Sequence, residues 1–150
     1  PVRNESHACD WVAGAAMMVR REVFEAIGLF DDDYFLYFDE VDFCLRARRA
    51  GWSCWYAPAS RVVHLVGQAT RISDSRLKAG RRPPYGFTSR RRYFLKHLGR
   101  CRALGADLAH VAGHGLWRIH RFVQRKADNS PPNFMRDLLC HSVVFKGFRI

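Results

Sequence analysis

The first part of the chain alternates short apolar runs with glycines and acidic clusters. Residues 10–20 (DWVAGAAMMVR) are mostly apolar and predict a buried strand, with Gly14 marking a bulge or a close backbone approach. Residues 21–27 predict a short helix that ends at Gly28. Residues 39–50 predict a second helix, because acids occupy its first turn and arginines its last. Two short strands are predicted at residues 52–57 and 61–65.

The rest of the chain spaces its apolar positions as helices do. Residues 71–92 have few apolar anchors and predict a loop. A helix is predicted from Tyr93, pausing near Gly99 and resuming over residues 102–125. After a Ser-Pro-Pro linker, residues 133–148 predict another helix that is both apolar and basic. The whole pattern predicts an α/β fold followed by amphipathic helices.

Composition narrows the class of protein. The chain has 150 residues and is 48% hydrophobic, enough for a packed core and too much for a disordered tail. It contains no apolar run of the roughly 18 residues that a membrane-spanning helix needs. The five cysteines form no C-x-x-C pair and favour a reducing compartment. The polar start resembles no signal peptide, and the absent initiator Met suggests a piece of a longer chain.

The net charge of +11 suggests a nucleic-acid binder, but its distribution changes that interpretation. Residues 1–70 carry a net charge of −3, residues 71–126 carry +13, and residues 127–150 carry +1. Such an asymmetry indicates that the two parts of the chain face different partners.

The densest candidate chemistry lies in residues 31–42, DDDYFLYFDEVD, where six of twelve side chains are carboxylates and four are aromatic. Acids at a helix start stabilise its dipole and cap its N–H groups without any further function. That explanation covers the acids of the helix but not their association with so many aromatic rings. Aromatic faces beside carboxylates are typical of sugar-binding sites.

Four segments in order then resemble one family. They are DWVAGAAMMVRREVFEAIGLFDDDYF (10–35), YFDEVDFCLRARRAGW (37–52), YAPASRVVHLVGQAT (56–70) and SRRRYFLKHLG (89–99). They resemble the C-terminal half of the catalytic domain of family 2 inverting glycosyltransferases, in particular the rhamnosyltransferase-like branch. The resemblance implies a partial GT-A fold. Residues 1–99 would be its acceptor-side half, and residues 100–150 a basic helical extension that lies near a membrane.

The resemblance also implies catalytic roles. The position of the family's general base is occupied by Glu40, preceded by Asp39, so the usual Glu-Asp order is reversed and Asp39 stays a rival for the role. Asp42 matches the last acid of the motif and would orient the base or the acceptor. His64 matches a residue that contacts the metal or the diphosphate in metal-dependent relatives, although a satisfied strand histidine is the ordinary alternative.

Acceptor or diphosphate binding is expected at a further set of residues: Trp11, Gly14, Tyr37, Arg91, Arg92 and Lys96. The basic and aromatic segment that holds the last three suits a diphosphate, a single-stranded nucleic acid or simply a solvated surface. We favour the diphosphate, because no nucleic-acid-binding motif is present.

The intact enzyme would transfer rhamnose or another hexose, with inversion, from a nucleotide-diphosphate donor to a polysaccharide or lipid-linked acceptor. Mg²⁺ or Mn²⁺ would be shared with a missing N-terminal half, so this chain alone would be inactive. Cytoplasmic, peripheral attachment to the inner face of the cell membrane is expected, and nucleic acid is not expected as a partner. The alternative is a non-enzymatic basic module that binds nucleic acid or anionic lipid.

Overall fold

The computed structural model describes residues 5–64, 80–127 and 130–149. The chain divides into two compact units, Pro1–Val66 and Gly67–Ile150, which are called unit 1 and unit 2 below. This boundary differs from the division at residue 99 that the sequence suggested. Residue 99 lies inside unit 2, because the helical segments on either side of it pack against each other.

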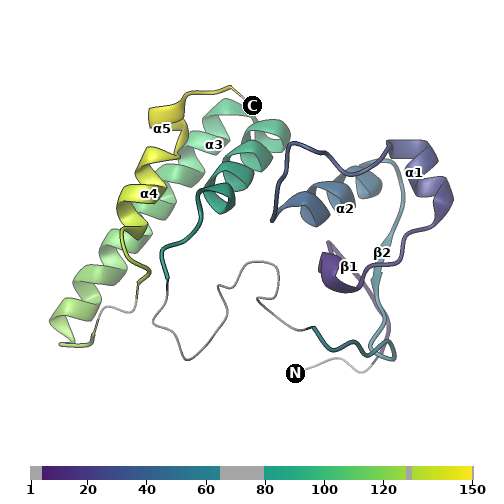
Figure 1. Ribbon diagram of the computed structural model, residues 1–150, viewed down its shortest axis with the longest axis horizontal. Helices are drawn as coiled ribbons and strands as arrows, with labels where there is room; N and C mark the ends of the chain where they lie inside the picture. The colour runs from purple at the N-terminus through teal and green to yellow at the C-terminus, as the bar shows by residue number, and fades with distance from the viewer. Residues whose placement is uncertain (1–4, 65–79, 128–129, 150) are drawn as a thin grey trace. The chain divides into compact units, whose positions relative to one another are not determined.

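Unit 1 contains a two-stranded antiparallel sheet and two helices (Figure 1). Strand β1 (His7–Cys9) pairs with β2 (Cys54–Tyr56), so that Cys9 lies opposite Cys54. Helix α1 (Arg21–Ile27) ends at Gly28, whose φ of 78° is a backbone conformation that favours glycine. Helix α2 (Asp39–Arg49) has three acids in its first turn and three arginines in its last. Both helices confirm the sequence prediction.

The predicted strand over residues 10–20 is wrong. A 3₁₀ turn at Gly14–Ala16 replaces it, although Ala13 and Met17 on either side keep extended backbone angles. The reason is that no neighbouring strand pairs with this segment among the described residues, and an extended segment without a ladder partner is not a strand. Residues 61–64 likewise form no strand, and Leu65 lies outside the described residues.

A small apolar core and one buried ion pair hold unit 1 together. The ring of Phe43 lies 4.5 Å from that of Phe30 and 5.2 Å from that of Phe24, between ring centroids. Beside this cluster Asp42 is fully buried and accepts a 2.8 Å hydrogen bond from Nε of Arg46. The other guanidinium nitrogens of Arg46 donate to the carbonyl oxygens of Ile27 and Leu29, at 2.7 and 2.8 Å. One side chain therefore joins α2 to the end of α1.

Unit 2 is helical. Helix α3 (Pro84–Val123) is broken at Gly99, which has a φ of 77°, and is followed by α4 (Phe134–Cys140) and α5 (Val143–Lys146). Arg90 forms an ion pair with Asp107, 17 residues further along α3. In a straight helix these residues would be about 25 Å apart. The chain must therefore turn back at Gly99, and the two segments of α3 form a hairpin, as Figure 1 shows.

Two buried aspartates fasten the short helices, one to this hairpin and one to the chain just before it. Asp107 also accepts a 2.8 Å hydrogen bond from the backbone N–H of Val143, at the start of α5. Asp137 on α4 accepts two hydrogen bonds from Arg81, at 2.6 and 2.8 Å. Unit 2 also contains two small apolar clusters. They are Phe87, Phe134 and Leu138 in one, and Leu95, Ala103 and Val143 in the other.

Two helix predictions for unit 2 need correction. The first helix begins at Pro84, within the predicted loop, and not at Tyr93. Proline suits the first turn of a helix, and Phe87 and Leu95 of this helix are buried in the core. Residues 71–79 of that predicted loop lie outside the described residues. The helix predicted over residues 133–148 is interrupted at His141 and Ser142, where the Ser142 hydroxyl donates to the carbonyl of Leu139 at 2.7 Å. The predicted pause at Gly99 is confirmed.

Replacement of Arg46 tests whether its ion pair holds unit 1 together. Arg46→Met leaves the Asp42 carboxylate buried without its cation, and we expect the free energy of unfolding to fall by about 3–5 kcal/mol. Urea unfolding followed by tryptophan fluorescence measures the change, since Trp11, Trp52 and Trp55 all lie in unit 1.

The matched control is Arg21→Met, which removes an arginine from an exposed ion pair with Glu25 in the same unit. An exposed pair of this kind contributes about 1 kcal/mol or less. Equal losses for the two variants would contradict a special role for Arg46.

Candidate active site

The candidate site lies at the start of α2, where the chain makes a strained turn. Tyr37 and Phe38 both have a φ of 68°, the left-handed region that bulky side chains rarely occupy. Such strain costs on the order of 1–3 kcal/mol per residue and collects at functional sites. The carbonyl of Phe38 then accepts a 2.8 Å hydrogen bond from the N–H of Asp42, which begins the helix. The turn thereby places Asp39 and Glu40 in the first turn of α2.

Asp42 is enclosed within unit 1. Besides its ion pair with Arg46, its other oxygen accepts a 3.4 Å hydrogen bond from the hydroxyl of Tyr34, which is itself buried. A carboxylate with no exposed surface does not touch an acceptor sugar. The orienting role expected for Asp42 stays a prediction, and its contacts in the structure are with Arg46 and Tyr34.

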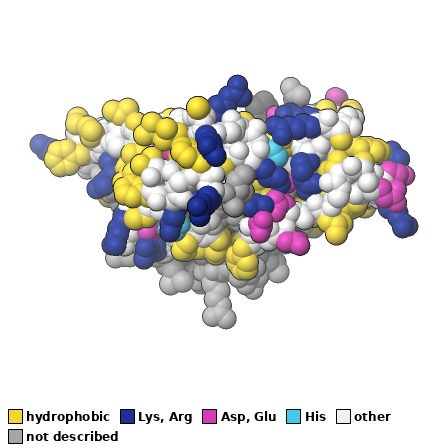
Figure 2. All heavy atoms as spheres, turned by 90° about the horizontal axis from the view of Figure 1, so that it is seen from above, with side chains coloured by type: hydrophobic (Ala, Val, Ile, Leu, Met, Phe, Trp, Pro, Cys, Tyr) yellow, Lys and Arg dark blue, Asp and Glu magenta, His cyan; other side chains and the backbone are white. Residues whose placement is uncertain are grey.

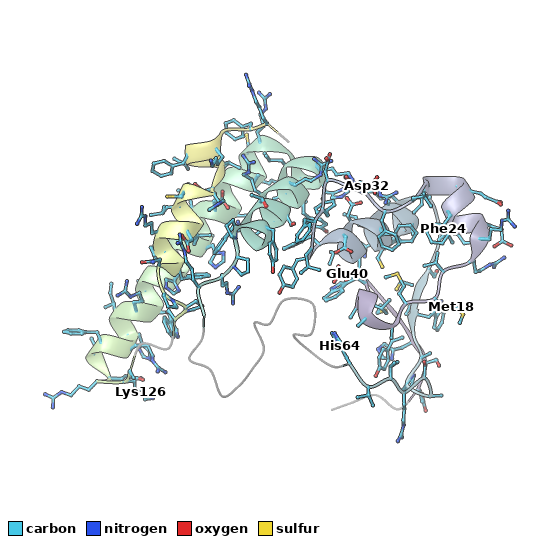
Figure 3. All side chains as sticks on the ribbon, in the orientation of Figure 1. Met18, Phe24, Asp32, Glu40, His64 and Lys126 are labelled. Atoms are coloured by element: carbon cyan, nitrogen blue, oxygen red, sulfur yellow. The ribbon has the colours of Figure 1, made fainter. Side chains whose placement is uncertain are left out.

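Glu40 has a different environment, half-buried at the edge of the unit (Figure 3). Burial raises the pKa of its carboxyl group above the usual range, and the adjacent Asp39 carboxyl raises that pKa further through a hydrogen bond and charge repulsion. The structure also brings Gly14 to this residue, since a Cβ added at Gly14 would lie 3.7 Å from Cβ of Glu40. Two residues that the sequence singled out from separate segments, Gly14 and Glu40, are thus neighbours.

A raised pKa suits a carboxylate that accepts a proton. A general base works best when its pKa lies near the operating pH, and burial beside another acid is a common way to raise the pKa of a glutamate. Glu40, with Asp39 next to it, therefore has the environment of a base. Asp42, two residues further along, has that of a structural residue.

Aromatic surface accompanies the acids. Trp11 is 49% exposed and Tyr37 is 45% exposed, so both rings, which are predicted to bind the acceptor or the diphosphate, have accessible surface. Phe35, in the same acidic loop as Tyr37, is 79% exposed. Rings and carboxylates are the groups that hold sugars, through contacts with C–H faces and hydrogen bonds to hydroxyls.

The metal assignment receives no geometric support. His64 is exposed near the end of the described part of unit 1 (Figure 3). Among the residues that the structure describes, no three His, Cys, Asp or Glu side chains are grouped closely enough to hold a metal ion. The metal role of His64 stays a prediction.

The predicted diphosphate residues Arg91, Arg92 and Lys96 all lie on the first segment of α3, in unit 2. All three side chains are half-buried. Arg91 donates to the carbonyl oxygens of Lys146 and Gly147, both at 3.3 Å, and so caps the end of α5. The guanidinium of Arg91 therefore has a structural use inside unit 2, which the sequence did not reveal.

Sequence reasoning missed two residues that support the site. Arg46 could have been found, because an aspartate and an arginine four residues apart on a helix are neighbours. Nothing in the sequence indicates that Tyr34 contacts Asp42.

Residues 2–82 of the chain match the sequence model of the glycosyltransferase-like family 2, which is more than half of its length. The chain belongs to this family. Membership implies a nucleotide-sugar transferase fold of the GT-A type. The described part of this family 2 chain is mostly helical, with one small sheet. No solved structure matches it.

Curated relatives of this family 2 chain include several rhamnosyltransferases. It is 37% identical to the N-acetylglucosaminyl-diphospho-decaprenol L-rhamnosyltransferase of Mycobacterium tuberculosis over 54% of its length and 27% of the relative's. It is 42% identical to the rhamnosyltransferase WbbL of Escherichia coli, over 41% of its length and 24% of the relative's. It is 45% identical to the low-salt glycan biosynthesis hexosyltransferase Agl10 of Haloferax volcanii, over 37% of its length and 18% of the relative's. The chain spans about a quarter or less of these proteins.

Titration of Glu40 tests the electrostatics of the acid pair. We expect Asp39→Asn to lower the pKa of Glu40, because it removes a neighbouring negative charge and lets an amide N–H donate to the ionised carboxylate. The remaining burial keeps the pKa above the usual value of about 4.3. Carboxyl-carbon NMR over a pH series measures both values.

Asp32→Asn serves as the control. Asp32 is exposed in the loop that precedes α2, and its replacement should leave the pKa of Glu40 unchanged. If Glu40 of the unsubstituted chain has the ordinary pKa of a glutamate, then burial and Asp39 do not raise it, and this description of the site is wrong.

Proposed function

We propose that unit 1 carries the acceptor-side, base-bearing part of an inverting glycosyltransferase. The observation that carries the proposal is the acid pair at the start of α2, where a half-buried Glu40 with a raised pKa lies between Asp39 and Gly14. Membership of family 2 supports it, since glycosyl transfer with inversion needs a carboxylate of this kind.

In the proposed reaction a hydroxyl oxygen of the acceptor attacks the anomeric carbon of the donor sugar. The new carbon–oxygen bond forms as the bond to the diphosphate breaks, and Glu40 takes the hydroxyl proton. Trp11 and Tyr37 present their exposed rings to the acceptor or donor sugar. Asp42 keeps α2, and with it Glu40, in place through Arg46.

The donor is proposed to be a nucleoside diphosphate sugar, carrying rhamnose or another hexose. The names of the relatives support this substrate class, and that of the mycobacterial protein supports a lipid-linked diphosphate acceptor. A divalent cation, Mg²⁺ or Mn²⁺, would offset charge on the departing diphosphate. His64 is the side chain of this chain that would contact the cation or the diphosphate, and residues of a longer protein would complete that site.

Replacement of Glu40 in the full-length enzyme tests the proposal. We expect Glu40→Gln to lower kcat by roughly 10²–10⁴-fold, because an amide accepts no proton. Donor affinity should change little, since the glutamine keeps the size of the side chain. Transfer of labelled sugar and calorimetric binding of the donor measure the two effects.

Asp39→Asn is the matched variant and Asp32→Asn the control. The reverse pattern, with transfer lost in Asp39→Asn and kept in Glu40→Gln, would assign the base to Asp39. Full activity in both Glu40→Gln and Asp39→Asn would overturn the proposed function.

For unit 2 we propose peripheral contact with an anionic membrane surface. The second segment of α3 exposes Leu116, Ile119, Phe122 and Val123, and Val144 and Phe145 of α5 are also exposed. Residues 108–127 contain no acidic side chain but four lysines and arginines, namely Arg118, Arg121, Arg125 and Lys126. Figure 2 shows basic side chains dispersed among apolar ones on unit 2. None of the helices in the described residues is both long and apolar enough to cross a bilayer.

This combination of apolar and basic surface favours a lipid headgroup layer over nucleic acid. An interfacial helix buries its apolar face among the acyl chains while its basic residues attract anionic lipid. Attachment at the cytoplasmic face of the cell membrane would bring the enzyme to a lipid-linked acceptor.

Vesicle sedimentation tests the membrane contact. Arg125→Gln with Lys126→Gln removes two exposed charges just after the end of α3. Lys126 is labelled in Figure 3. At about 1 kcal/mol for each basic residue, we expect roughly 30-fold weaker binding to phosphatidylglycerol-containing vesicles. Vesicles of phosphatidylcholine alone should bind weakly in every case.

Arg20→Gln with Arg21→Gln removes the same net charge from exposed positions of unit 1 and should leave binding unchanged. Equal losses in the two double variants would contradict a defined surface on unit 2. Tighter binding to single-stranded RNA than to these vesicles would favour the nucleic-acid module instead.

A further inference from the structure

Two cysteines meet across the small sheet of unit 1. Cys9 is the last residue of β1 and Cys54 the first of β2, and the antiparallel register places them directly opposite each other. The Sγ of Cys9 lies 3.7 Å from the Sγ of Cys54, as a thiol that donates to the other sulfur. These residues are 45 positions apart in the sequence, which contains no spacing that predicts the contact.

The backbone already meets the requirement for a disulfide. Opposite residues of an antiparallel pair have Cα atoms about 4.5 or 5.5 Å apart, and disulfides form over about 4.4–6.8 Å. The sulfur atoms must approach from 3.7 Å to about 2.05 Å, a change that side-chain rotation can supply.

A hollow gives small molecules access to the pair. It has a volume of about 370 Å³, and both cysteines contribute to its wall. The remaining lining residues are Ala8, Asp10, Arg48, Gly51, Trp52 and Ser53. Cys9 and Cys54 are both partly exposed, whereas the third cysteine of unit 1, Cys44, is buried. A reagent in the hollow therefore reaches the cross-strand pair before it reaches Cys44.

The surroundings of Cys54 affect the rate of oxidation. Burial, together with the neighbouring thiols of Cys9 and Cys44, raises the pKa of Cys54 to about 12. Because only a thiolate attacks a disulfide, Cys54 is a slow nucleophile at neutral pH. Closure of a bond between the two cysteines is therefore slow at neutral pH and becomes faster as the pH rises.

We propose that Cys9 and Cys54 form a reversible oxidation site that reacts with a low-molecular-weight disulfide. The thiolate of Cys9 attacks one sulfur of the reagent, releases one thiolate and leaves a mixed disulfide on Cys9. The thiolate of Cys54 then attacks the Cys9 sulfur and releases the second half of the reagent. In total two cysteine thiols are oxidised to one disulfide, and one reagent disulfide is reduced to two thiols.

The bond would enclose the candidate active site in a covalent loop. Residues 9–54 include Gly14, the strained turn, the Asp39–Glu40 pair and the Asp42–Arg46 ion pair. Closing this loop restricts the unfolded chain, so the oxidised form of unit 1 should unfold at a higher urea concentration.

Treatment of the reduced 150-residue chain with oxidised glutathione tests the proposal. The background variant Cys101→Ser with Cys140→Ser removes the two exposed thiols, which would otherwise form adducts. We expect two of the remaining three thiols to be lost, and dithiothreitol to restore them. Digestion and mass spectrometry should recover Cys9 joined to Cys54. The rate of closure should rise about tenfold for each pH unit, as the thiolate fraction of Cys54 does below its pKa.

Cys54→Ser in the same background should stop the reaction at a glutathione adduct on Cys9. The same oxidation of the background variant unfolded in urea should join Cys9, Cys44 and Cys54 in several combinations. This control shows whether the bond between Cys9 and Cys54 depends on the folded structure. Glutathione adducts without an internal bond in the background variant, or a dominant bond to Cys44, would overturn the proposal.

Discussion

The ion pair between Asp42 and Arg46 is the interaction on which unit 1 depends. A carboxylate with no exposed surface is costly unless a cation and hydrogen bonds accompany it, and Arg46 and Tyr34 supply both. Because Arg46 also donates to the carbonyls of Ile27 and Leu29, the same side chain fixes the end of α1 and the chain that follows it. The strained turn at Tyr37 and Phe38 can persist only against a framework of this kind.

Unit 2 uses the same type of contact. Asp107 joins the two segments of α3 through Arg90 and holds the start of α5, while Asp137 joins α4 to Arg81. The apolar clusters of this unit contain only a few residues each. Directed ion pairs in this unit fix which segments meet. Their formation also costs hydration, because the aspartates are buried.

The parts of the structure that the sequence predicted are those that depend on neighbouring residues. Helices α1 and α2 and the break at Gly99 follow from glycines and from charges near helix ends. The acids in the first turn of α2 follow from the local sequence, although the contact between Glu40 and Gly14 does not. What failed depends on distant partners. The strand expected at residues 10–20 has no ladder partner in the described residues, and the contact between Cys9 and Cys54 needs a sheet register.

The spacing of the acidic motif now has a physical explanation. Asp42 lies on the same side of α2 as Phe43 and Arg46, and it is fully buried there. Glu40 lies two residues earlier, little more than half a turn, and so on a different face of the helix. At this end of the helix the dipole favours its ionised form. Its pKa is nevertheless raised, so burial and the Asp39 carboxyl together outweigh the dipole and its backbone hydrogen bond. One short helix thus encloses one carboxylate in an ion pair and leaves another half-buried, with its pKa raised.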